Sequence, residues 1–538
     1  MITATSAANP LLTYEQLLEE NRVLRHANKN LTEDNNYLSE LIRHFKRLRF
    51  APSSEITPSG QGTLFNEAEM LAESAAPDDD ATKPGKKKKK HGKPVRKPLP
   101  DHLPQVHKTI DLAEADKICP KSGVALKQMG EEVSKQLDIE PTKAFVIVTH
   151  RLKYGCDCAA CKEGLDAPTM KTAPVEAQPI PKSMASPGLL AYIATSKYAD
   201  ALPLARQEGI FKRYGIDLVR STMASWMITL GTIVTPLINL IREELLKGLV
   251  IQADETRIQI HKGTGKESTA ESYMWAFMRD GPNGSKIVLY EVGPSRSHTV
   301  PLRVLEGYSG YLQTDGYSAY ETLGAKMPGI TLVADWAHVR RKFDEAVKAV
   351  PEDTKGEIKA KVGLKLINDL FRIEREDIGL DATAEVRLKI RQEKSRKVIA
   401  ELKKWADETA PTLPPKTLSG TAMRYMLERW QKLTLFLDTP ILRLDTNPVE
   451  GIIRPFVIGR KNWLFADTLK GAEASAVLYS LIVMARSADL NPFLYLKAVF
   501  TDLPKAKTAE DVEALLPWIW KPITKDIKIQ NTLLVNIR

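Results

Sequence analysis

The spacing of hydrophobic and polar positions changes several times along the chain, and each change predicts a different structure. Residues 13–50 place a leucine or a phenylalanine at every seventh position, which is the repeat of one long helix. From Val250 the period becomes that of strands, through VIQADETRIQI, SYMWAFMRD, KIVLYEV and GYLQTDG. The run TLVADWAHVRRKFDEAVKAV then passes from a strand into a helix, and residues 351–435 have almost no strand character.

The order of these elements predicts a multidomain α+β protein, since 538 residues are too many for a single hydrophobic core. Three neighbouring strands followed by strand–helix alternation favour a ribonuclease-H-like α/β core at 248–350 and 436–490, split by a helical insertion at 351–435. In chain order, the other predicted segments are a leucine-zipper-like helix (13–50), a disordered acidic and then basic linker (51–99), a cysteine-cluster domain (100–180), a helix-turn-helix-like region (187–235) and a helical C-terminal region (491–538).

The first helix has the side-chain pattern of a coiled coil. Its d positions are Leu17, Leu24, Leu31, Leu38 and Phe45, and its a positions are Tyr14, Asn21, Asn28, Asn35 and Ile42. Leucine at d with asparagine at a selects the register and two strands, at a cost in stability. The alternative is an amphipathic helix packed on its own chain, where three asparagines would sit badly in the core. We therefore expect a homodimer or a higher oligomer.

Composition and charge narrow the class of protein. Hydrophobic residues make up 43% of the chain, an ordinary fraction for a globular protein, and no run is long enough to span a membrane. The N-terminal stretch MITATSAANPLL lacks a basic region ahead of an apolar core, so we expect no signal peptide and a cytoplasmic protein. The net charge of +10 favours an anionic partner, and the basic run at 84–98 is compatible with phosphate contacts, although such blocks are normally solvated.

The four cysteines cluster in one segment. Cys156, Cys158 and Cys161 form C-x-C-x-x-C, and Cys119 lies upstream. Four thiolates can close a tetrahedral zinc site, but two C-x-x-C pairs are usual and the first pair would need a cysteine at Ser122. The cluster therefore predicts either a Zn²⁺ site or ordinary reduced cysteines.

Residues 187–235 have helix signals separated by a turn. Pro187 suits a first helical turn, and Ser221 suits an N-cap position. A helix, a turn and a helix with Arg213 and Arg220 resemble a DNA-binding pair. A plain helical hairpin beside the next domain is the alternative interpretation.

Three acids lie where chemistry on phosphate groups needs them. Asp254 and Asp315 each end an apolar strand-like run, and Glu450 opens the stretch after the insertion. In a ribonuclease-H-like sheet the two aspartates would be neighbours, and the three carboxylates together would hold two divalent ions for phosphoryl transfer. Any single acid is more often an exposed surface residue; Glu255 and Asp335 are competitors for the role, and Glu255 would face away from Asp254.

Basic and aromatic residues flank these acids and are candidates for DNA contact. His338, Arg340 and Arg341 follow Asp335 at a helix start, where a solvated helix face is the alternative. The segment after Glu450 contributes Arg454, Arg460, Lys461 and Trp463.

Several motifs resemble the transposases of the insertion sequence 66 family. They are ADET at Asp254, LQTDGYSAY, WAHVRRKF, the D-x-N-x-x-E from Asp445 to Glu450, and GRKNWLF, and similar stretches extend over nearly the whole chain. The resemblance implies a DDE-type transposase with a leucine zipper, a zinc-binding segment, a helix-turn-helix and a ribonuclease-H-like core. Position by position, Asp254, Asp315 and Glu450 match the catalytic acids of the family. Ser122 replaces a family cysteine, and Gly451 replaces the arginine that usually follows the glutamate.

The predicted function is therefore that of a DNA transposase. It would bind double-stranded DNA at the ends of its mobile element, cleave the strands with Mg²⁺ or Mn²⁺, and join them to target DNA. The resemblance also implies a bacterial protein that associates with the nucleoid when bound to DNA, and accessory proteins of the same element. A non-catalytic DNA-binding protein derived from such an enzyme is the alternative.

Overall fold

A computed structural model of the chain describes residues 14–50, 144–155, 170–172, 175–262, 271–350, 358–379 and 382–521. The chain divides into two compact units, Met1–Ser53 with Pro174–Lys521 and Ser54–Ala173 with Pro522–Arg538. In the second unit, β1 (Lys153–Gly155) and β2 (Met170–Thr172) pair antiparallel. The predicted linker and all four cysteines lie outside the described residues, so the zinc prediction is not addressed by the structure.

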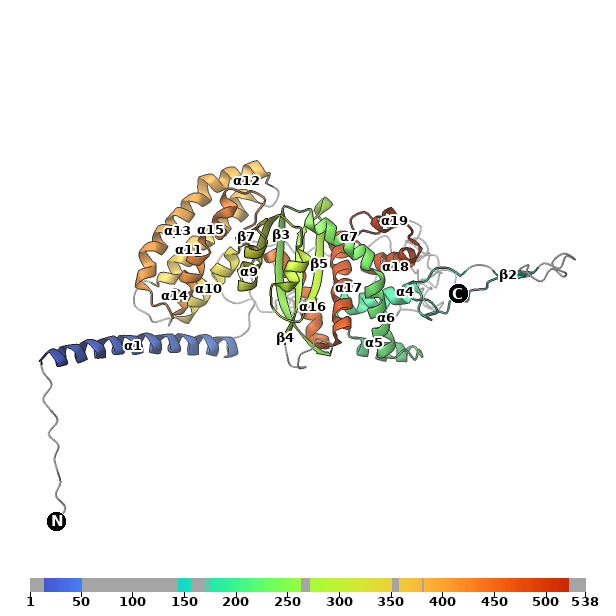
Figure 1. The fold of residues 1–538 in the computed structure, drawn as a ribbon, viewed down its shortest axis with the longest axis horizontal. Coiled ribbons are helices and arrows are strands. Elements are labelled where there is room, and N and C mark those ends of the chain that lie inside the picture. The colour runs from blue at the N-terminus through green and yellow to red at the C-terminus, as the bar shows by residue number, and fades with distance from the viewer. Residues whose placement is uncertain are drawn as a thin grey trace, which may run out of the picture. The chain divides into compact units, whose positions relative to one another are not determined.

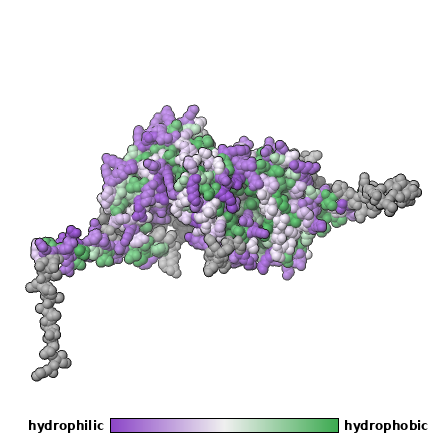
Figure 2. All heavy atoms as spheres, viewed as in Figure 1, coloured by the Kyte–Doolittle hydropathy of each residue, from purple (hydrophilic) through white to green (hydrophobic). Residues whose placement is uncertain are grey.

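The predicted N-terminal helix is confirmed as α1 (Tyr14–Phe50). The five d-position side chains are at least half exposed, and hydrophobic and hydrophilic side chains alternate on the surface of α1 (Figure 2). α1 contacts the rest of the first unit: Lys416 Nζ lies 2.8 Å from Asp34 Oδ1, and Leu418 N donates to Glu40 Oε2 at 3.1 Å. The apolar row predicted for a coiled coil is therefore presented at the surface of α1.

The first unit is built around a mixed six-stranded sheet, which confirms the predicted combination of helices and sheet (Figure 1). Its strands are β3 (Val250–Lys262), β4 (Glu271–Asp280), β5 (Lys286–Gly293), β6 (Gly310–Thr314), β7 (Ile330–Ala334) and β8 (Phe465–Thr468). The order is β5-β4-β3-β6-β7, with β8 on β3. β3, β4 and β5 pair antiparallel, whereas β6 and β8 run parallel to β3, and β7 runs parallel to β6.

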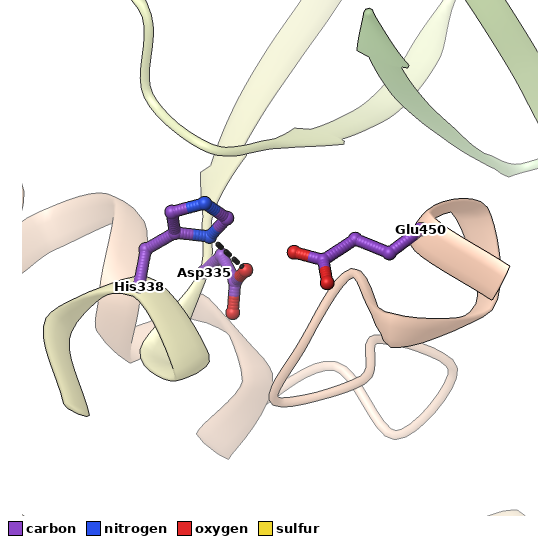
Figure 3. Close-up of side chains that lie close together, drawn as sticks. All are labelled: Asp335, His338 and Glu450. Atoms are coloured by element: carbon purple, nitrogen blue, oxygen red, sulfur yellow. Dashed lines mark hydrogen bonds and ion pairs between the residues drawn. The ribbon is translucent and has the colours of Figure 1, made fainter. Parts of the chain in front are cut away.

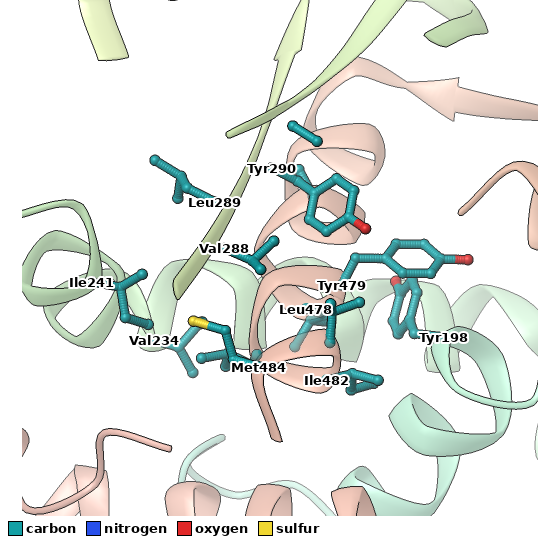
Figure 4. Packing of buried hydrophobic residues seen from close by; sticks show 14 of the residues in the cluster. Tyr198, Val234, Ile241, Val288, Leu289, Tyr290, Leu478, Tyr479, Ile482 and Met484 are labelled. Carbon is teal, nitrogen blue, oxygen red and sulfur yellow. The ribbon is translucent and has the colours of Figure 1, made fainter. Parts of the chain in front are cut away.

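Helices pack with β3, β4 and β5 to form the larger hydrophobic core. They are α4 (Pro187–Tyr198), α5 (Leu204–Arg213), α6 (Arg220–Ile233), α7 (Thr235–Leu246), α8 (Thr299–Val304), α9 (Ser318–Lys326), α16 (Asn447–Trp463), α17 (Leu469–Ser487), α18 (Pro492–Asp502) and α19 (Ala509–Glu513). The central helix α17 lies against β5 and α6 (Figure 1). Three tyrosines from α4, β5 and α17 meet here: the Tyr479 ring lies 5.1 Å from that of Tyr198 and 6.0 Å from that of Tyr290 (Figure 4).

The smaller core lies at β7 and contains the segment predicted as a helical insertion. Its helices are α10 (Trp336–Ala349), α11 (Lys359–Arg372), α12 (Ala384–Ile390), α13 (Arg396–Thr409), α14 (Leu418–Glu428) and α15 (Trp430–Thr434), with π-helical turns at Ile373–Ile378 and Arg391–Ser395. Buried apolar residues of α10, α11, α13 and α14 pack together beside β7. The described residues between α10 and α16 contain no strand, as the sequence pattern predicts.

One helix start differs from the prediction. Pro187 does begin α4, where Ser186 caps the helix by accepting a hydrogen bond from Leu189 N. Ser221 is not an N-cap, however, because α6 already begins at Arg220. The physical reason is tertiary: Glu208 Oε1 on α5 accepts a hydrogen bond from Arg220 N at 3.2 Å and replaces a local cap.

Among the described helices, none is by itself long and apolar enough to cross a membrane. Only α6 and α7 taken together reach that length and composition, and they are bent by 52° relative to one another.

Candidate active site

Two strands of the sheet bring the first two acids to one place. β3 and β6 are parallel neighbours with Gln252 opposite Gln313. If this register continues, Asp254 falls opposite Asp315, directly after the end of β6. Asp315 Oδ1 accepts a hydrogen bond from Tyr317 N at 2.9 Å, which fixes the carboxylate at the start of the following loop.

Two buried glutamines attach the segment that follows the insertion to the sheet by hydrogen bonds. Gln252 Nε2 on β3 donates to Asp445 O at 3.0 Å, and Gln313 Nε2 on β6 donates to Arg443 O at 2.7 Å. The segment that leads into α16 is therefore fastened to the same two strands that carry Asp254 and Asp315. Glu450 then projects from the first turn of α16.

Negative charge is concentrated at the acids and shifts the pKa of Asp254. Burial, followed by the charges of Glu255 and Asp315, raises the pKa of Asp254 to about 7, and Glu450 contributes in the same direction. Carboxylate oxygens are the ligands that Mg²⁺ and Mn²⁺ prefer, and a divalent cation would offset this crowding of negative charge. The residues present therefore fit a divalent metal ion.

The raised pKa makes cation binding depend on pH. Between pH 3.8 and about 7 the folded protein retains the Asp254 proton that the unfolded chain has lost, so the free energy of unfolding falls as pH rises through this window. Below about pH 7 a cation must displace this proton, and we expect the affinity for Mg²⁺ to fall about tenfold per pH unit. Titration of the protein with MgCl₂ from about pH 5 to about pH 9, followed by calorimetry, measures this. Asp254→Asn should remove this pH dependence of the Mg²⁺ affinity. An equally steep pH dependence in that variant would contradict the role of the Asp254 proton.

Glu255 lies in the site with a partner of its own. Two guanidinium nitrogens of Arg296 reach Glu255 Oε1, Nε at 2.6 Å and Nη2 at 2.5 Å, and Tyr320 Oη donates to Glu255 Oε2 at 2.7 Å. Arg296 Nη2 is also 3.6 Å from Asp315 Oδ2, and its guanidinium lies 3.7 Å from the centre of the Tyr317 ring. Arg296 thus links a buried, neutralised glutamate to one of the predicted catalytic acids. Sequence reasoning did not find it, because an arginine in a loop carries no periodic signal.

Asp335 begins α10 beside Glu450 (Figure 3). Its fully buried carboxylate accepts three hydrogen bonds, from Ala337 N at 2.6 Å, His338 Nδ1 at 2.6 Å and Thr446 Oγ1 at 2.7 Å. Among the described residues, Asp335, His338 and Glu450 form the one group of three whose possible ligand atoms all lie within 4.8 Å of one another. Asp335, a competitor for the catalytic role in the sequence, is therefore part of the site.

The predicted DNA-contacting arginines of α10 differ in position. Arg341 Nη2 lies 3.5 Å from Glu450 Oε1, and its side chain is 54% exposed. Arg340 Nε instead donates to Asn368 Oδ1 at 2.5 Å, which joins α10 to α11. Of the two arginines, Arg341 is therefore the one that lies beside a predicted catalytic acid.

The basic and aromatic residues after Glu450 spread along α16. Arg454 and Lys461 are exposed, and Arg460 is half-buried. Trp463 packs edge-on against Phe456, with ring centres 5.5 Å apart, at the margin of the larger core. Its DNA contact stays a prediction, as do those of Arg213 and Arg220, which are exposed at the end of α5 and the start of α6.

Gly451 is the fifth residue of α16 and directly follows Glu450. A Cβ added there meets nothing within 4 Å, and Pro455 has no N–H to bond the Gly451 carbonyl, so this turn is weakly held. We expect Gly451→Arg to stabilise the fold by about 0.5–1 kcal/mol and to strengthen DNA binding at low salt. Thermal unfolding and fluorescence anisotropy with duplex DNA measure the two effects. Gly451→Ala should reproduce only the first, and equal DNA affinity of the two variants would contradict a role for the charge.

Comparison with protein families gives matches over most of the chain. The family described as "Transposase IS66 family" matches residues 182–474, and "IS66 C-terminal element" matches 480–518. Residues 116–159 match "zinc-finger binding domain of transposase IS66", a segment that includes Cys119, Cys156 and Cys158. Residues 37–107 match "Transposase C of IS166 homeodomain".

Similar proteins are found in Sinorhizobium fredii (strain NBRC 101917 / NGR234). "Uncharacterized protein y4qI" is 36% identical over 447 residues, which are 80% of this chain and 79% of that protein. "Uncharacterized protein y4jD" is 32% identical over 434 residues, 79% of this chain and 81% of that protein. "Uncharacterized protein y4hP" is 30% identical over 444 residues, 80% of this chain and 77% of that protein.

Proposed function

Since the chain belongs to the IS66 family of transposases, we propose that it cleaves and joins DNA strands with Asp254, Asp315 and Glu450 as its catalytic acids. The observation that supports this proposal is the shared location of the elements that carry the three acids. Asp254 lies on β3, Asp315 directly follows its parallel neighbour β6, and the segment that leads to Glu450 is hydrogen-bonded to these two strands through Gln252 and Gln313.

The topology of the sheet supports a ribonuclease-H-like core for this chemistry. The middle strand β3 pairs antiparallel with β4 on one side and parallel with β6 on the other. Further outward, β5 is antiparallel to β4 and β7 is parallel to β6. Asp315 directly follows β6 and Asp335 directly follows β7, so both acids lie at the carboxyl ends of parallel strands, where open α/β sheets commonly bind their ligands.

The side chains at the site have different proposed roles. When bound, Mg²⁺ or Mn²⁺ supplies charge stabilisation for phosphodiester transfer and raises the reactivity of the attacking hydroxyl. Asp254, Asp315 and Glu450 would hold such cations. Arg296 neutralises Glu255 and steadies Asp315, and the half-exposed Arg341 is placed to contact a DNA phosphate beside Glu450.

A non-catalytic DNA-binding protein derived from a transposase remains the alternative function. The raised pKa of Asp254, caused by burial and then by neighbouring acids, argues for the enzyme. Holding acids together in a partly buried place costs stability, and a protein that only binds DNA gains nothing from it.

The remaining regions are proposed to handle DNA and assembly. α1 would pair two chains through its exposed leucine row, and the cysteine cluster would bind Zn²⁺. Double-stranded DNA at the element ends and at the target would be the substrate, with accessory proteins of the element as further partners in the bacterial cytoplasm. A monomer at micromolar concentration by light scattering would contradict the pairing of α1.

Strand cleavage and joining test the proposed function directly. The full-length protein is incubated with labelled element-end duplexes, target DNA and MgCl₂ or MnCl₂, and products are resolved on denaturing gels. We expect nicks at the element ends and joined products that require the cation. Specific binding of the ends without cleavage under either cation would favour the non-catalytic alternative.

A further inference from the structure

Asp335 is placed to orient its neighbours. Its side chain is completely buried, and both oxygens are already used: Oδ1 accepts from Ala337 N, and Oδ2 accepts from His338 Nδ1 and Thr446 Oγ1. A carboxylate that accepts three short hydrogen bonds has little capacity left for a cation. What it can do is hold the His338 ring in one orientation.

The bond to Asp335 determines which ring nitrogen of His338 is available. Nδ1 lies 2.6 Å from a carboxylate oxygen and acts as the donor in that bond. Nε2 then carries the lone pair, and Arg341 Nη1, which has only hydrogens to offer, lies 3.5 Å from it. The imidazole lies beside Glu450, and its side chain keeps 22% of its surface exposed (Figure 3).

We propose that His338 Nε2 and Glu450 ligate one divalent cation together, with Asp335 as the outer carboxylate that orients the imidazole. A histidine that binds a metal through one nitrogen and a carboxylate through the other is a recurring arrangement in metalloproteins. This inference rests on the proposed function, because the cation at Glu450 is the one used for strand transfer. It deepens that function by assigning a nitrogen ligand to one cation position.

The mixed ligand set has a consequence for the choice of metal. Imidazole nitrogen favours transition cations, whereas Mg²⁺ prefers a shell made only of oxygen. The position at His338 and Glu450 therefore favours Mn²⁺ over Mg²⁺, in contrast to a position held by Asp254 and Asp315 alone. Arg341 lies 3.5 Å from both ligands and its side chain is 54% exposed, and a cation bound at this position would replace these contacts.

Pulsed electron paramagnetic resonance of the full-length protein with MnCl₂ alone tests this assignment. We expect a ¹⁴N coupling to the bound Mn²⁺ that disappears in His338→Asn. It should persist in His298→Asn, a matched control in which a half-buried histidine that contacts Lys326 is changed. Absence of nitrogen coupling in the unaltered protein, or its persistence in His338→Asn, overturns the proposal.

The role of Asp335 has a separate measurement. Asp335→Asn keeps the shape of the side chain and an acceptor for Ala337 N, and we expect Mn²⁺ to bind it about 10–100-fold more weakly. Calorimetric titration with MnCl₂ measures the affinity, and thermal unfolding shows whether the variant is folded. A folded Asp335→Asn with unchanged affinity contradicts the orienting role. DNA cleavage by a protein whose Mn²⁺ has no nitrogen coupling would overturn this inference and leave the proposed function standing.

Discussion

Asp315→Asn is expected to reduce strand cleavage and joining by roughly a thousandfold or more, while DNA binding is retained. The asparagine oxygen still accepts the hydrogen bond from Tyr317 N, so the loop keeps its shape. What is lost is a negative charge that a catalytic cation needs. The same change should also lower the pKa of Asp254, since the charge of Asp315 is one of the causes that raise it.

The measurement compares cleavage rates and DNA affinity of the variant and the unaltered protein. Asp407→Asn is the matched control, because it removes one negative charge from an exposed aspartate of α13 that pairs with Lys403. It should retain full activity. Equal cleavage by Asp315→Asn and the unaltered protein would remove Asp315 from the proposed catalytic set.

Gly316→Ala is expected to destabilise the protein by about 1–3 kcal/mol and to impair cleavage as well. Gly316 has φ +78°, a left-handed conformation that alanine rarely adopts, and an added Cβ would lie 2.5 Å from Arg429 Nε. Arg429 has little freedom to move, because its Nη2 donates to Gly316 O at 2.9 Å and its guanidinium lies 4.0 Å from the centre of the Tyr425 ring.

Thermal unfolding and the cleavage assay measure the two effects. Gly209→Ala on α5 is the matched control: an added Cβ meets nothing within 4 Å there, and we expect a small gain in stability. Similar stability changes in both variants would show that the turn after Asp315 tolerates a side chain.

The contacts around Gly316 also assign a role to the insertion. Tyr425 Oη on α14 donates to Asp315 O, and Arg429 directly after α14 donates to Gly316 O. The insertion therefore clamps the backbone that carries a predicted catalytic acid. Its helices separate Asp315 from Glu450 in the sequence and position Asp315 in space.

Local patterns were sufficient to predict α1 and the strands β3 to β7, whereas β8 was not predicted. The heptad row predicted α1, and the period of two predicted β3, β4 and β5, because backbone geometry alone places residues on faces at these spacings. Where a cap comes from a distant residue, local signals fail. Ser221 has the chemistry of an N-cap, but Glu208 on α5 supplies the acceptor and α6 starts one residue earlier.

Within the candidate site, the sequence by itself singled out Asp254, Asp315 and, with the family motifs, Glu450. It placed Asp315 correctly after the end of β6, but Asp254 does not end a strand, because β3 continues through pairing with β4 as far as Lys262. The tertiary structure alone decided the distant residues that surround them: Arg296 on Glu255, Thr446 on Asp335, and the glutamines that hold the entry to α16. The reason is physical. A strand end is a local property of hydrophobic spacing, whereas a hydrogen bond between residues more than a hundred positions apart, such as Thr446 to Asp335, exists only once the sheet and the insertion have packed.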